Sequence, residues 1–148
     1  MKITTIESRA KKIVKEWSPR LGLEKWDIVI RATDSKSLTR DAHMSNVAGA
    51  IIPLGCCHAS AVDMSAVILL NAEAEWSMKL DVWQSLPVTV VHELLHAFFE
   101  STGVNGAIEM VAANESQDRD FSHGIWMGLH PSIERIAQAM LLGQKSIS

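Results

Sequence analysis

The feature that most constrains this chain is an apolar stretch that carries three polar side chains. Residues 90–99 read VVHELLHAFF, and the valines, leucines and phenylalanines are typical of a buried helix. On a helix, His92 and His96 lie one turn apart on the same side, because they are four residues apart in sequence. Glu93 adjoins them. Burying three such groups costs free energy unless they have partners, so the sequence indicates a functional reason for them.

The HExxH spacing suits metal chemistry. Two imidazoles one turn apart converge on one point, and imidazole nitrogen binds zinc at about 2.0–2.1 Å. Zinc lowers the pKa of a bound water to about 7, and a glutamate beside the first histidine reaches that water as a general base. We therefore predict that His92 and His96 bind Zn²⁺ and that Glu93 is catalytic. The alternative, a hydrogen-bonded pair of core histidines, leaves the buried Glu93 unexplained.

Length and composition predict one folded domain over residues 1–148. A chain of 148 residues with 47% hydrophobic and 21% charged residues is long enough for a single hydrophobic core. The net charge of -3, without a basic cluster, argues against a nucleic-acid partner. Neither a signal-peptide pattern nor a run of membrane-spanning length is visible, so we expect no membrane and a cytoplasmic location. Cys56 and Cys57 are adjacent and offer no CxxC spacing for zinc.

Apolar periodicity predicts an α+β fold. Helical spacing occurs over residues 3–17, 72–83, 87–101 and 131–143, whereas apolar strand-like runs cover 26–31, 47–54 and 61–70. We expect the polar stretch 33–46 to be a loop and the Cys-Cys-His sequence at 56–58 to form a corner between two strands. The expected domain is a short three- to four-stranded mixed sheet, packed on the N-terminal helix and the HExxH helix, with a C-terminal helix.

With HELLH on a helix in this order of elements, the sequence resembles the zincin metallopeptidases, most closely the small minimal gluzincin-type zincins of bacteria and phages. The resemblance covers most of the chain, although HELLH at 92–96 is the only specific motif. It implies His92 and His96 as zinc ligands, Glu93 as general base, and a peptide or protein as substrate. By analogy, the strand before the HExxH helix, Val67 to Asn71, pairs with an extended peptide.

The third zinc ligand departs from the standard patterns. The metzincin extension fails because Phe99 and Thr102 stand where it has glycine and histidine, and no complete NExxSD stretch is present. In minimal zincins the third ligand comes from the start of a closing helix. His130 aligns with the usual acidic ligand of the family, whereas Glu134 has the usual chemistry one turn later. Glu109 is a weaker third choice.

On the helix expected from Pro131 onward, His130 and Glu134 both flank the apolar face. Either one completes the metal site, and the other is then a candidate to orient a ligand imidazole. A helical glutamate is also commonly just solvated. His43, His58 and His123 are candidates for stabilising an oxyanion, but each lies in a polar or turn-like stretch.

The sequence favours a zinc-dependent peptidase and leaves two rivals. One is a zincin-like interaction protein of phage or mobile-element origin that has no catalytic activity. The other is a zinc-dependent endoribonuclease with an HxxxHxxxxxH helix, which has little support because position 102 is Thr and the chain is acidic.

Overall fold

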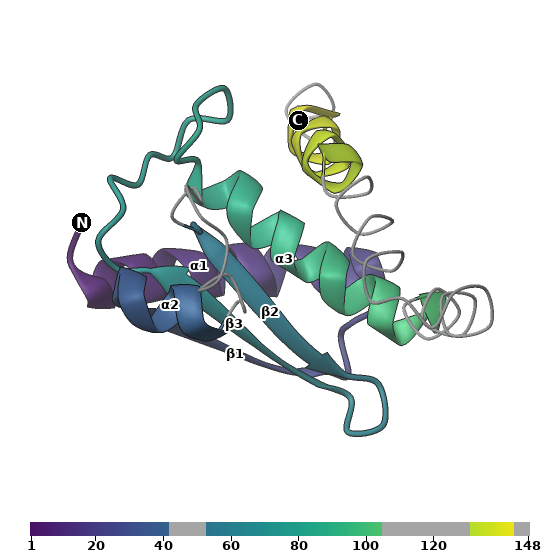
Figure 1. Cartoon of the computed structure of the whole chain (residues 1–148). Helices are drawn as coiled ribbons and strands as arrows, with labels where there is room; N and C mark the ends of the chain where they lie inside the picture. Colours follow the sequence, from purple (N-terminus) through teal and green to yellow (C-terminus); the bar gives the residue numbers. More distant parts are fainter. Residues whose placement is uncertain (42–52, 105–130, 144–148) are drawn as a thin grey trace, which may run out of the picture.

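The computed structural model describes residues 1–41, 53–104 and 131–143. Within them the chain forms a three-stranded mixed sheet with helices packed against it, which confirms the α+β class (Figure 1). The strands are β1 (Asp27–Thr33), β2 (Gly55–Ser60) and β3 (Ser65–Asn71), in the order β1-β3-β2. β3 is therefore central, parallel to β1 and antiparallel to β2.

One face of the sheet is apolar, as alternation along each strand requires. Ile30 of β1 pairs with Ile68 of β3, and Ile68 pairs with Cys57 of β2. In the next row, Leu70 pairs with Gly55. Ile30, Ile68 and Leu70 belong to the hydrophobic core. Cys57 and Gly55 pair with residues of this face, so they lie on the side of the sheet that the helices cover.

Two helices, α1 (Ile3–Trp17) and α3 (Leu86–Ser101), supply most of that cover. α1 buries a stripe at helical spacing and ends before the short 3₁₀ turn η1 (Pro19–Leu21). α3 begins after Ser85, whose hydroxyl accepts a hydrogen bond from the Val88 amide, and Pro87 lies in its first turn. Gly103 follows with a φ of 75°. Both predicted helices are confirmed.

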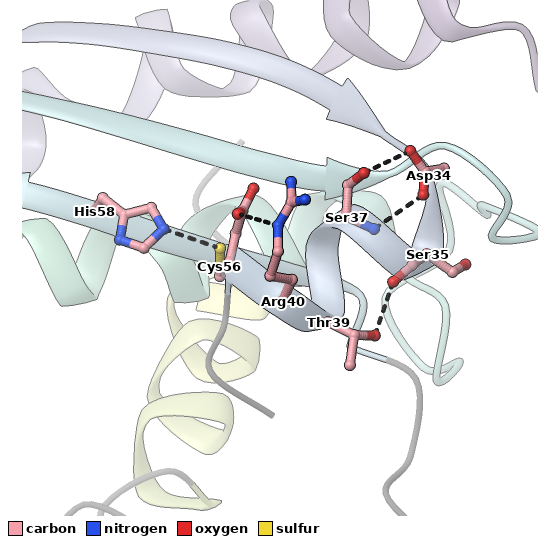
Figure 2. Close-up of polar contacts among 8 residues, drawn as sticks. Asp34, Ser35, Ser37, Thr39, Arg40, Cys56 and His58 are labelled. Atoms are coloured by element: carbon pink, nitrogen blue, oxygen red, sulfur yellow. Dashed lines mark hydrogen bonds and ion pairs between the residues drawn. The ribbon is translucent and has the colours of Figure 1, made fainter. Parts of the chain in front are cut away.

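The expected loop at 33–46 is wrong over its first half, because α2 (Ser35–Asp41) is a helix. Asp34 caps it: its carboxylate accepts hydrogen bonds from the Ser37 amide at 2.9 Å and the Ser37 hydroxyl at 2.8 Å (Figure 2). These bonds hold the pKa of Asp34 below its ordinary value. α2 packs against β3 and β2, and Leu38 is its buried residue.

The corner expected at Cys56–His58 is also wrong, because these residues lie inside β2. The predicted strand 61–70 begins later, since residues 61–64 form the hairpin turn between β2 and β3. Most of the predicted strand 47–54 lies outside the described residues, and its last two residues are not in a strand.

The helix predicted over residues 72–83 is absent, and turns and bends take its place. Trp76 explains the difference, because its buried indole Nε1 donates a hydrogen bond to the Asn71 carbonyl at 2.7 Å. An isolated bridge between Ser77 and Ser85 then closes the segment as a loop before α3. Tertiary anchoring overrides the local helical composition here.

Residues 131–143 form the C-terminal helix expected from Pro131. Ile133, Ala137 and Leu141 are buried in the same hydrophobic cluster as α1, α3 and the sheet. Figure 1 shows this helix in yellow, crossing beside α3. In the described parts of the chain, no helix is long and apolar enough to cross a membrane.

Candidate metal centre

His92 and His96 face each other on α3, as their spacing predicts. Their Nε2 atoms are 3.2 Å apart, and their ring centroids are separated by 5.0 Å. Two Nε2 atoms bound to one zinc ion at about 2.0–2.1 Å, and 3.2 Å apart, subtend an angle of about 100° at the metal, near the tetrahedral value. This separation fits a shared zinc ion, and it equally fits a hydrogen bond between the two rings.

Glu134, from the C-terminal helix, holds the His92 ring from its other side. The His92 Nδ1 donates a hydrogen bond to Oε2 of Glu134 at 2.9 Å. With the proton on Nδ1, Nε2 is the nitrogen through which His92 would bind a metal, which is the arrangement that carboxylate partners impose on ligand histidines. Burial lowers the pKa of His92, but the Glu134 hydrogen bond and the charges of Glu93 and Glu134 outweigh it, so the net shift is upward.

Glu93 points from the same helix towards β2. Its side chain is 5% exposed, and a Cβ built on Gly55 would lie 3.1 Å from its Oε1. Burial raises the pKa of Glu93 to about 7; the proximity of His92 lowers it and Glu134 raises it further. No hydrogen bond to its carboxylate is found within the described residues. A buried carboxyl of this kind is poised to exchange a proton near neutral pH.

The structure pairs His92 with His96 and with Glu134, and Glu93 lies close enough to His92 and Glu134 for their charges to interact. His130, Glu109, His43 and His123 lie outside the described residues. In the described ranges, no group of three or more His, Cys, Asp or Glu side chains gathers in a way that could hold a metal ion.

His58 lies away from this centre. Alternation along β2 puts it on the face opposite Cys57, where its Nε2 is 3.7 Å from the Cys56 sulfur (Figure 2). Cys57 lies on the Glu93 side, and burial followed by the charge of Glu93 raises the pKa of its thiol well above the ordinary range. Burial, with the charges of Glu93 and Asp41, raises the pKa of Cys56 to about 12, so both cysteines are poor nucleophiles.

Sequence reasoning missed Gly55, whose closeness to Glu93 depends on how β2 packs on α3. The sequence carried no signal for it, because the glycine precedes Cys-Cys-His in a stretch that resembles a turn rather than a strand. Comparisons with protein-family models, curated proteins and solved structures find no match.

Proposed function

We propose that the protein is a zinc-dependent peptidase built on a zincin-like domain. The observation that carries the proposal is the 3.2 Å separation of two helical Nε2 atoms beside a buried glutamate. A hydrogen-bonded histidine pair would explain the separation alone. It would not explain why a carboxyl with a pKa near 7 is buried next to the pair.

In this proposal His92 and His96 bind zinc through Nε2, and Glu134 orients His92. The oxygen of Glu134 lies at Nδ1, the nitrogen opposite the one that faces His96, which favours orientation over metal binding for this residue. His130 is then the candidate third ligand, since it directly precedes the C-terminal helix and is one turn from Glu134 in sequence. When bound, zinc supplies Lewis acidity to a water molecule and to the scissile carbonyl.

Glu93 is the group that transfers a proton from water to the leaving amine in this proposal. Its buried carboxylate takes a proton from the attacking water and later delivers it to the leaving amine. A pKa near 7 suits both steps, because the group gains and loses a proton readily at neutral pH.

The strand expected to pair with substrate requires correction. β3 contains Val67 to Asn71, and it is paired on both sides, by β1 and β2, so it has no free edge. β1 and β2 are the two edge strands of the described sheet, and of these β2 is the one that packs on α3. We therefore assign pairing with an extended peptide to β2. The free thiols Cys56 and Cys57 suit a reducing compartment such as the cytoplasm.

The test is hydrolysis of an unstructured protein substrate such as casein. We expect cleavage by the zinc-loaded protein, loss of cleavage with a chelator, and recovery on adding zinc. Glu93→Gln should retain zinc but lose cleavage, while the matched control Glu24→Gln, at an exposed carboxyl outside β2 and α3, should cleave normally. Zinc binding without any cleavage would instead support a zincin-like interaction protein that has no catalytic activity.

A further inference from the structure

Gly55 lies where β2 passes over the proposed general base. It is the first residue of β2 and faces α3. A Cβ at this position would lie 3.1 Å from Oε1 of Glu93, 3.1 Å from Cγ2 of Thr89, and 3.2 Å from the Leu69 carbonyl oxygen. All three contacts are tight, so a side chain here requires its neighbours on α3 and β3 to shift by a few tenths of an ångström.

The backbone conformation does not explain the glycine. Among the described residues, only Gly22 and Gly103 are glycines with positive φ. Glycine within a strand is unfavourable relative to alanine, and in a strand it often marks a close approach. Gly55 is therefore needed for space rather than for its φ angle.

Asn71 prevents β2 from moving away to make that space. Its side-chain amide donates a hydrogen bond to the Pro53 carbonyl at 3.1 Å, and its backbone N–H donates to the Leu54 carbonyl at 2.9 Å. Its Oδ1 accepts hydrogen bonds from the Ser35 hydroxyl at 3.1 Å and the Glu73 amide at 2.9 Å. Asn71 itself is 2% exposed, and its hydrogen bonds tie the two residues before Gly55 to the end of the central strand.

We propose that Gly55 is a positioning residue for Glu93. Because it has no side chain, β2 closes on α3 and holds the Glu93 carboxylate in the orientation that proton transfer requires. This inference rests on the proposed function, in which Glu93 is the general base. A side chain at position 55 must push against that carboxylate, since Asn71 holds the start of the strand.

The kinetic test is Gly55→Ala. We expect kcat to fall about tenfold or more, with KM and zinc content close to wild type, because small misplacements of a catalytic group slow chemistry more than binding. Adding Thr89→Ser removes the Cγ2 methyl at 3.1 Å and should not restore kcat. If Gly55→Ala alone is insoluble, kcat is measured on the double variant Gly55→Ala with Thr89→Ser instead. Gly22→Ala is the matched control: its φ of 70° predicts a lower Tm with unchanged kcat.

A second measurement needs no hydrolysis. The loss of Tm caused by Gly55→Ala is compared in metal-free wild type and in metal-free Glu93→Ala. The loss should be smaller in Glu93→Ala, because the contact with Oε1 is gone while those with Thr89 and Leu69 remain. Equal losses, or an unchanged kcat in Gly55→Ala, would overturn the positioning role. If the losses differ but the wild type does not cleave protein, the positioning contact stands and the peptidase proposal fails.

Discussion

The Nδ1 atom of His92 lies 2.9 Å from a carboxylate oxygen of Glu134, 42 residues further along the chain. This contact joins the HELLH helix to the C-terminal helix at the candidate metal centre. In the proposed zinc site, Glu134 would fix the tautomer of His92 without binding the metal itself.

The contact predicts different consequences for Glu134 and His130. If Glu134 orients His92, Glu134→Ala should weaken zinc binding by about 10–100-fold, and Glu134→Gln, which still accepts a hydrogen bond, should weaken it less. His130→Ala should weaken binding more than either change, since it removes a ligand. Competition titration with a fluorescent zinc chelator measures all three. The reverse order, with Glu134→Ala the most damaging, would make Glu134 the third ligand.

The raised pKa of Glu93 predicts that the metal-free protein loses stability as the pH rises through neutrality. Burial raises the pKa of Glu93 from 4.5 to about 7, so its contribution to folding is complete below pH 4.5 and is lost as the pH rises through 7. The difference corresponds to roughly 3 kcal/mol. Glu93→Gln should therefore raise the free energy of unfolding by roughly this amount at about pH 8, and leave it unchanged at about pH 4.

Urea denaturation in the presence of a chelator measures this effect. If Glu93→Gln is no more stable than wild type at about pH 8, burial of the ionised Glu93 carboxylate does not destabilise the folded protein. Glu93 would then lack the raised pKa that is typical of functional sites.

Removing metal predicts a loss of thermal stability that depends on the histidine pair. Zinc at about 100 times its Kd stabilises the folded state by roughly 2.7 kcal/mol, which raises Tm by about 5–10 °C for a chain of this size. A chelator should abolish this rise in wild type. His96→Ala should show no zinc-dependent rise, whereas His58→Ala should show the full one. Differential scanning calorimetry with and without zinc separates these cases, and an equal rise in His96→Ala would place the metal elsewhere.

The sequence predicted the parts of the fold that depend on local pattern. α1, α3 and the C-terminal helix each carry an apolar stripe, and Pro87 and Gly103 mark the ends of α3 in the sequence. α2 was missed because it is short and buries only Leu38, although Asp34 followed by Ser37 is a helix-capping signal. β2 was missed because Gly-Cys-Cys-His resembles a turn, although it pairs with β3 across the short turn at residues 61–64.

The candidate site, like the fold, was predicted only where it depends on local pattern. HELLH was found because helical geometry alone puts His92 next to His96. The orientation of Glu134 and the closeness of Gly55 to Glu93 depend on how separate elements pack together, which the spacing of residues within one helix does not contain. Which of His130 and Glu134 binds metal stayed open in the sequence for that reason.

Anomalous scattering at the zinc absorption edge, from crystals grown with zinc, tests the central claim most directly. We predict one strong peak at about 2.0–2.1 Å from the Nε2 atoms of both His92 and His96, with the Glu93 carboxylate beside it but not bound to it. Crystals with no peak between these two imidazoles, their Nε2 atoms joined only by a hydrogen bond, would contradict the account.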